Sequence, residues 1–322
     1  MKKKVLPLMM AILMVLGGFR ITASANTGTT SVTMTKTLTA TGLEDTTFYF
    51  TVEEAGYTNT SASVTSQPEI DDFSITVSAG STTGTYNITL PTYTSVGVYT
   101  YKITETSGSI AGVTYSSAEL YLVVTVTNDG SGGLVQTAVV HVGSTTGDKN
   151  TNEYTNTYNA GTLTVSKSVT GNLGDTTKEF SVTVTFTKDS TTTINSTISY
   201  TVGTTTYTIE PSDWTGDTCE VTITVTDGSS VTFTNIPYGV SYTVEETDYS
   251  SDGYTTTYSG TDGNSGTGTL DSDSETVAIT NYKNDTVDTG VILDSLPYVL
   301  ILAVVVLGAV YLIFRRRTTD RY

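Results

Sequence analysis

The sequence contains few of the residues that disulfides, metal sites and most catalytic sites require. Of its 322 residues, one is cysteine, one is histidine and one is tryptophan. A single cysteine, Cys219, excludes an intramolecular disulfide. Neither Cys219 nor His141 has a further ligand at a metal-site spacing, so we interpret both as structural residues and expect no metal and no cofactor. Covalent stiffening of this chain must therefore use chemistry other than a disulfide.

Positive charge is scarce over most of the chain. The segment 26–285 contains seven lysines, no arginine and nearly all of the 32 acidic residues, and the whole chain has a formal net charge of −17. Such a surface repels phosphate groups, which argues against nucleic acid as a partner. No serine nucleophile motif or carboxylate pair indicates a hydrolase, so we expect a protein that is not an enzyme.

Long apolar runs occur only near the two ends of the sequence. Three lysines, an apolar run and the small residues 23–25 form the pattern of a secretory signal peptide over residues 1–25. Residues 296–314 carry no charge and are followed directly by three arginines, 315–317. This length and its basic flank predict a transmembrane helix with a cytoplasmic tail. The residues between the two runs would then lie outside the cell.

Between these runs, short segments rich in Thr, Val and Tyr alternate with turns of Gly, Asp and Asn. This pattern predicts an all-β fold of two tandem immunoglobulin-like sandwiches, residues 26–159 and 160–284, before a sorting segment over 285–322. In the first domain we predict strands over residues 31–40, 47–53, 73–78, 85–90, 97–106, 118–128, 133–142 and 153–158.

Three kinds of polar residue recur at positions that strand alternation turns toward the core. Each domain has a lysine in its opening strand, a glutamate at the end of a tyrosine-rich strand and an asparagine in its closing strand, each sharing a face with apolar residues. The sets are Lys36, Glu105 and Asn156 in the first domain, and Lys167, Glu246 and Asn281 in the second. Two further residues fit the same alternation: Glu54, an alternative acid to Glu105, and Lys188, another inward lysine.

A buried lysine or glutamate is costly unless it is neutral or paired, so a repeated set needs an explanation. One explanation is a hydrogen-bonded cluster. The other is an intramolecular isopeptide bond. Burial lowers the pKa of an amine and raises that of a carboxylic acid, so a neutral lysine can attack the asparagine carbonyl. We expect the acid to hydrogen-bond the carbonyl oxygen and to transfer protons while ammonia leaves, in a single turnover.

Several stretches carry a resemblance to a known family. Residues 97–105 read Gly-Val-Tyr-Thr-Tyr-Lys-Ile-Thr-Glu, and residues 124–130 read Val-Thr-Val-Thr-Asn-Asp-Gly. On these stretches the first domain resembles the Spy0128-type isopeptide-linkage domain of streptococcal pilins. On residues 170–172, 233–239 and 242–247, the second domain is similar to the Cna B-like partner domain of such pilins.

In that family a bond joins the lysine of the first strand to the asparagine of the last strand. The resemblance therefore implies two bonds, each with a catalytic glutamate. They are Lys36 to Asn156 with Glu105, and Lys167 to Asn281 with Glu246.

The segment before the C-terminal apolar run resembles a cell-wall sorting signal of Gram-positive surface proteins, although it lacks the usual Leu and Pro. Its residues are Thr286, Val287, Asp288, Thr289 and Gly290. The resemblance implies that a sortase cuts after Thr289 and joins the chain to another subunit or to peptidoglycan. The alternative is a membrane-anchored ectodomain that is never cut.

A polymer of such chains also needs an exposed lysine. Lys149 lies in a polar loop directly before the closing strand, where the related pilins carry their linking lysine. Lys102, Lys178 and Lys283 are alternatives. We therefore predict a structural pilin, the shaft or major subunit of a sortase-assembled pilus on the cell surface. The alternative function is an anchored adhesin that binds a host ligand through loops such as 252–272.

Overall fold

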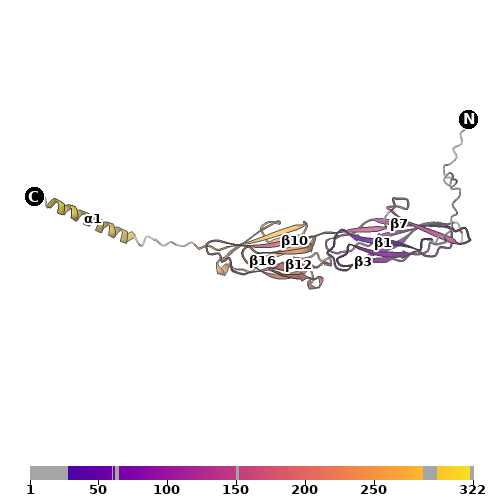
Figure 1. The fold of residues 1–322 in the computed structure, drawn as a ribbon, viewed down its shortest axis with the longest axis horizontal. Coiled ribbons are helices and arrows are strands. Elements are labelled where there is room, and N and C mark those ends of the chain that lie inside the picture. Colours follow the sequence, from indigo (N-terminus) through magenta and orange to yellow (C-terminus); the bar gives the residue numbers. More distant parts are fainter. Residues whose placement is uncertain (1–27, 60, 62–64, 150–151, 286–295, 320–322) are drawn as a thin grey trace, which may run out of the picture.

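The computed structural model describes residues 28–59, 61, 65–149, 152–285 and 296–319. They form two β-sandwich domains placed end to end and a separate C-terminal helix (Figure 1). The predicted all-β architecture of two tandem sandwiches followed by an apolar helix is therefore confirmed. The predicted signal peptide lies outside the described residues.

The first domain consists of two facing sheets. Its strands are β1 (Ser31–Leu38), β2 (Thr46–Asn59), β3 (Phe73–Val77), β4 (Thr83–Thr89), β5 (Gly97–Glu105), β6 (Val113–Thr114), β7 (Glu119–Asn128), β8 (Leu134–Val142) and β9 (Glu153–Tyr158). One sheet has the order β4-β1-β9-β6 and the other β3-β2-β5-β7-β8. The eight predicted strands all form. The ninth, β6, has two residues and is too short to show a hydrophobic alternation.

The second domain is built in the same way. Its strands are β10 (Ala160–Thr170), β11 (Phe180–Thr187), β12 (Ile198–Val202), β13 (Thr205–Ile209), β14 (Thr218–Val225), β15 (Ser230–Pro237), β16 (Ser241–Glu246), β17 (Thr255–Gly260), β18 (Thr267–Thr269) and β19 (Ser274–Tyr282). Two short 3₁₀ turns, η1 (Pro211–Asp213) and η2 (Ser250–Asp252), lie between strands. The sheet orders are β13-β12-β15-β10-β19-β17 and β14-β11-β16-β18.

In each domain the first and last strands are parallel neighbours in one sheet. β1 pairs with β9, and β10 pairs with β19. In both registers the residue opposite the lysine lies two positions before the asparagine. These opposite residues are Tyr154 for Lys36 and Ile279 for Lys167. The lysine and the asparagine are thus diagonal neighbours on one inward face, within reach of a long side chain.

Each sandwich has its own hydrophobic core. Met34, Phe48 and Tyr99 are among the largest buried side chains of the first, and Phe180 and Phe233 of the second. Full burial of one such side chain contributes about 1.5–3 kcal/mol. Apart from Ala111 of the first domain, which packs in the second core, the two cores are built from separate segments of the chain, so each domain can hold its own buried polar cluster.

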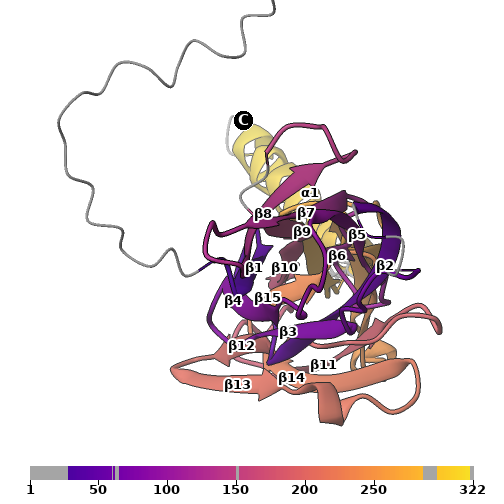
Figure 2. The same ribbon diagram turned by 90° about the vertical axis from the view of Figure 1, so that its right-hand side faces the viewer.

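The two domains meet through a short, hydrogen-bonded junction, and in the end-on view of Figure 2 the second domain lies behind the first and partly below it. Asn159 alone separates β9 from β10. The Asn235 amide donates to the carbonyl of Gly42 at 2.7 Å and accepts from the Tyr158 hydroxyl at 3.1 Å. Asn235 has φ of 62°, a region that asparagine tolerates. A Cβ on Gly42 would lie 2.5 Å from the Asn235 Oδ1, so the close approach of the domains requires glycine there.

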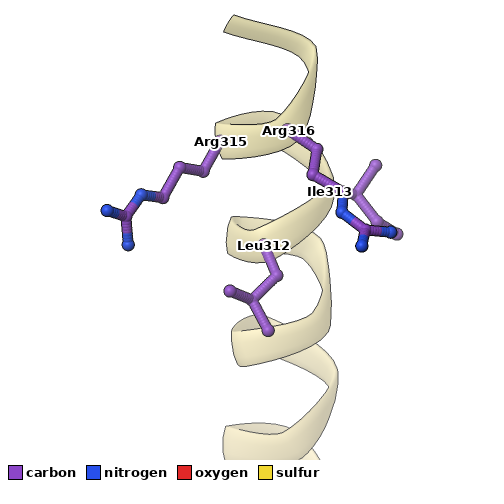
Figure 3. Close-up of a pocket in the computed structure, with 4 residues that line it drawn as sticks. All are labelled: Leu312, Ile313, Arg315 and Arg316. Atoms are coloured by element: carbon purple, nitrogen blue, oxygen red, sulfur yellow. The ribbon is translucent and has the colours of Figure 1, made fainter. Parts of the chain in front are cut away.

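The C-terminal helix α1 spans Leu296–Thr319 and is long and apolar enough to cross a membrane. Its segment Tyr298–Arg316 has a mean hydropathy of 2.5, and all side chains of that segment are exposed. The helix continues past the predicted end at 314, through the arginines. Figure 3 shows Leu312 and Ile313 on the last apolar turn, with Arg315 and Arg316 extending from the turn that follows. A helix that is apolar on all sides is stable only in an apolar environment such as the interior of a membrane. The arginines at its end are typical of residues that flank a membrane span.

Candidate functional site

The first domain buries Lys36, Glu105 and Asn156 together between its sheets. Lys36 and Asn156 lie on the neighbouring strands β1 and β9, and Glu105 ends β5 in the facing sheet. The Nζ of Lys36 donates to Oε2 of Glu105 at 3.1 Å, and the Nδ2 of Asn156 donates to Oε1 at 2.8 Å. Lys36 and Asn156 are 0% exposed and Glu105 is 8% exposed. One carboxylate therefore bridges the amine and the amide.

The carbonyl oxygen of Asn156 faces a backbone donor. The N–H of Ser116 donates to Oδ1 of Asn156 at 2.8 Å. Because an N–H group can only donate, this bond identifies the amide oxygen, and the amide nitrogen must face Glu105. We predicted that the glutamate would hydrogen-bond the carbonyl oxygen; the structure instead pairs it with the amide nitrogen. The Ser116 N–H is placed to stabilise negative charge on that oxygen.

Burial also makes Lys36 a better nucleophile. It lowers the pKa of Lys36 from an ordinary 10.5 to about 8, while the neighbouring Glu105 opposes the shift. The ring of Phe48 covers the amine, with Nζ 4.9 Å from the ring centroid. A neutral amine is therefore accessible near pH 8 in a core from which water is excluded.

The second domain repeats this arrangement with one change. Lys167 on β10 donates from Nζ to Oε1 of Glu246, at the end of β16, at 2.6 Å, and both side chains are fully buried. The other carboxylate oxygen, Oε2, accepts from the hydroxyl of Thr256 at 3.0 Å. Burial lowers the pKa of Lys167 against the opposing effect of Glu246, and the Phe180 ring lies 4.2 Å from its Nζ. Phe180 thus has the role that Phe48 has in the first domain.

Asn281 of β19 is buried with both of its amide atoms unsatisfied. It is 0% exposed, and neither Nδ2 nor Oδ1 has a hydrogen-bond partner among the residues that the structure describes. Each buried polar group left unpaired costs about 1–3 kcal/mol. An asparagine therefore occupies a position where, as a free amide, it destabilises the fold.

Residues 32–159 match the family of Spy0128-like isopeptide containing domains. The match extends over nearly the whole of the first domain. Residues 161–283 match a domain family of unknown function, DUF7601. All three residues of the first cluster lie within the Spy0128-like domain, and all three of the second lie within the DUF7601 domain.

Solved structures of streptococcal pilins are similar to both domains together. The crystal structure of the major pilin from Streptococcus pyogenes is 26% identical and covers 80% of this chain and 99% of its own, with a TM-score of 0.55. A mutant of that pilin is 27% identical over the same shares, with a TM-score of 0.54. The major pilin T3.2 of another S. pyogenes serotype is 22% identical over 79% of this chain and 98% of its own, with a TM-score of 0.54, and shows the fold alone. The comparison with curated proteins gives no match.

In the Spy0128-like domain, the alternative acid Glu54 does not join the cluster. A β-bulge between Glu54 and Gly56 shifts the register of β2 against β5, and the Glu54 side chain is exposed. Lys188, the alternative lysine of the DUF7601 domain, pairs with Asp217 at 2.7 Å and is only partly buried. The acid of the first cluster is therefore Glu105 and not Glu54, and the lysine of the second cluster is Lys167 and not Lys188.

The remaining sequence-predicted residues lie away from the clusters. Lys149 is exposed at the end of the loop after β8 of the Spy0128-like domain, bridged to His141 as a short antiparallel pair. The alternative lysines each contact another side chain: Lys102 meets Glu119 at 2.7 Å, Lys178 meets Asp252 at 3.2 Å, and Lys283 lies 5.2 Å from the Tyr254 ring centroid. The predicted sortase motif, 286–290, lies outside the described residues. Within the described part of the chain, no group of three or more His, Cys, Asp or Glu could hold a metal.

Sequence reasoning missed Ser116 and Thr256, which complete the two clusters. Ser116 acts through its backbone N–H, which every residue except proline has, so its identity carried no signal. Thr256 belongs to a chain in which threonine is frequent on both faces of the strands. Only the strand register, which places Thr256 directly opposite Asn281, distinguishes it from the others.

Proposed function

We propose that this protein is a structural pilin, the major or shaft subunit of a sortase-assembled pilus, with one Lys–Asn isopeptide bond in each domain. One observation carries the proposal. Two buried clusters of Lys, Glu and Asn have the same strand register, in a chain similar over 80% of its length to the major pilin from Streptococcus pyogenes. Two costly clusters in one arrangement are explained by a shared reaction better than by packing alone.

The geometry of the first cluster supports a complete route to the bond. The neutral Nζ of Lys36 attacks Cγ of Asn156, and the Ser116 N–H stabilises the charge that develops on Oδ1. Glu105 accepts a proton from Nζ and then gives that proton to Nδ2, since its two oxygens contact those two nitrogens. The bond from Cγ to Nδ2 breaks and ammonia leaves. The amine loses one proton and the leaving nitrogen gains one.

The product stabilises the fold in two ways. A cross-link that closes a loop of this length contributes on the order of 4–5 kcal/mol by constraining the unfolded chain. In the second domain, the bond would also remove the unpaired amino group of Asn281. The clusters are thus precursors of a covalent tie between the first and last strands.

Intact mass tests the two bonds. We expect the secreted part of the chain, residues 26–285, to be lighter than its sequence mass by two ammonia molecules. Peptide mapping should recover Lys36 linked to Asn156 and Lys167 linked to Asn281. The double variant Asn156→Ala and Asn281→Ala is the control and should show its full sequence mass. A wild-type chain of full sequence mass would refute the proposed chemistry.

We expect pH to control the first bond through Lys36. Its amine is charged below about pH 8 and neutral above it, and only the neutral form attacks. The rate should therefore fall about tenfold per pH unit below the pKa and level off above it. The measurement is the rate of ammonia loss after denatured, unlinked chain is refolded into buffers on both sides of that pKa. A rate that does not change with pH below 8 would contradict a neutral-amine mechanism.

Assembly would use the exposed Lys149 and the sorting segment. A sortase cuts between Thr289 and Gly290 and holds the Thr289 carbonyl as a thioester. The Nζ of Lys149 in another subunit then attacks this carbonyl, releases the sortase thiol and forms an amide between subunits. Peptidoglycan takes the place of the lysine when the finished pilus is attached to the wall. The helix α1 holds each subunit at the membrane until it is cut.

A further inference from the structure

The two clusters differ in what their glutamates contact. In the first domain, the carboxylate of Glu105 contacts the amide of Asn156 directly at 2.8 Å. In the second domain, no hydrogen bond joins Glu246 to Asn281 in the described structure, and the carboxylate oxygen that does not face Lys167 accepts from Thr256 at 3.0 Å. The second domain therefore lacks a direct proton route from its acid to its leaving group.

Thr256 lies where it can close this gap. In the antiparallel pairing of β17 and β19, Thr256 is directly opposite Asn281. Directly opposite residues project to the same face with Cβ atoms about 4.5–5.5 Å apart. The Thr256 hydroxyl thus contacts the carboxylate of Glu246 from the strand position opposite Asn281, whose amide makes no hydrogen bond in the described structure.

We propose that the hydroxyl of Thr256 relays a proton from Glu246 to the leaving nitrogen of Asn281 when the second isopeptide bond forms. The inference rests on the proposed function, because it concerns the same reaction. It assigns a role to a residue outside the Lys, Glu and Asn set, and that role is specific to the second domain.

The strand β17 holds the relay in place from two positions. Thr256 contacts Oε2 of Glu246, and the hydroxyl of Tyr258, two residues along the same face, accepts from the backbone N–H of Glu246 at 2.9 Å. Lys167 occupies the other oxygen, Oε1, at 2.6 Å. The carboxyl group therefore has one oxygen facing the nucleophile and the other facing the relay.

The relay balances with Glu246 protonated on Oε2, so that this oxygen donates to Oγ1 of Thr256 in the reacting state in place of accepting from it. As Nζ of Lys167 bonds to Cγ of Asn281, Nζ gives one proton to Oε1. Oε2 gives its proton to Oγ1 of Thr256, and Oγ1 gives its own proton to Nδ2. The bond from Cγ to Nδ2 breaks and ammonia leaves. Glu246 ends as a neutral acid protonated on its other oxygen, and Thr256 ends unchanged.

The test is the rate of the second bond in Thr256→Val, which keeps the shape of the side chain and removes the hydroxyl. Proton transfer by a positioned group contributes about 10²–10⁴ in rate, so we expect a loss of about a hundredfold. Thr256→Ser keeps a hydroxyl and should restore most of the rate. Thr257→Val, at the adjacent exposed position, is the matched control and should react like the wild type.

Residues 28–285, which contain both cores, are refolded from denatured chain, and each bond is followed by mass spectrometry of its linked peptides. The first bond serves as an internal reference reaction and should form at the wild-type rate in every variant. Slowing of the wild-type second bond in D₂O, with a smaller effect in Thr256→Val, is a signature that a purely structural role would not give. If Thr256→Val does not fold, Thr256→Ala provides the same comparison.

A second bond that forms at the wild-type rate in a folded variant without the hydroxyl would overturn the relay and leave the proposed function intact. A wild-type chain that forms the first bond and never the second would instead refute the proposed chemistry of the second domain, and the relay with it.

Discussion

Glu105→Ala should leave the Spy0128-like domain without its cross-link and lower its free energy of unfolding by several kcal/mol. The substitution removes the one group that contacts both Nζ of Lys36 and Nδ2 of Asn156, so no acid remains to transfer the proton. The lost cross-link accounts for on the order of 4–5 kcal/mol. For a domain of this size, that corresponds to a fall in melting temperature of about 10–20 °C.

Calorimetry and intact mass together measure this effect. The variant should be heavier than expected for a doubly linked chain by one ammonia molecule, and only the transition of the first domain should move. Glu54→Ala is the matched control, since Glu54 is a glutamate of the same sheet whose side chain is exposed. It should keep both bonds and its melting temperature. A Glu105→Ala chain that still loses both ammonia molecules would show that another group is the acid.

Lys149→Ala should abolish covalent polymers in a host that carries the cognate sortase. The substitution removes the proposed nucleophile for the Thr289 thioester, and no other change in the subunit is expected, because Lys149 is exposed. Wild-type chains should give a ladder of species that survives boiling in detergent, and the variant should give only single subunits. The expected loss is therefore complete.

Two controls separate the nucleophile from its charge and from other lysines. Lys149→Arg keeps the positive charge without a reactive amine and should also abolish the ladder. Lys178→Ala removes a lysine that pairs with Asp252 at 3.2 Å and should leave the ladder intact. A full ladder from Lys149→Ala would exclude Lys149 as the linking residue, whereas its loss only in Lys178→Ala would transfer that role to Lys178.

The buried clusters could be predicted from sequence because side chains alternate strictly between the two faces of a strand. Lys36 shares its parity with Met34 and Leu38, and all three are buried in the structure. The same rule placed the glutamates and asparagines of both domains on inward faces, and each is buried. A period of two residues is thus enough to find a polar residue in a core, provided that the strand is regular.

The rule fails where the strand is irregular or where the relevant group is not a side chain. Glu54 follows Phe48, Phe50 and Val52 in parity and pairs in register with Tyr101, but it is the last residue before the bulge and its side chain is exposed. The donor to Asn156 is a backbone N–H, and the residue type does not indicate which backbone N–H takes this role. The contacts of Asn235 across the domain junction depend on how two separately folded sandwiches approach each other, which strand patterns do not encode.

The single residue between β9 and β10 has a mechanical consequence in the proposed pilus. Tension that enters a subunit at Lys149 passes along β9, through Asn159 and into β10. With the second bond formed, it would cross from Lys167 to Asn281 and leave through Thr289. The chain between Lys167 and Asn281 would bear no tension, and neither would most of the first domain, which lies beside the loaded strand. The first bond then holds β1 against a strand under tension, while the second bond itself carries the tension. The fibre could therefore lengthen only by stretching two short segments of each subunit, from Lys149 to Lys167 and from Asn281 to Thr289.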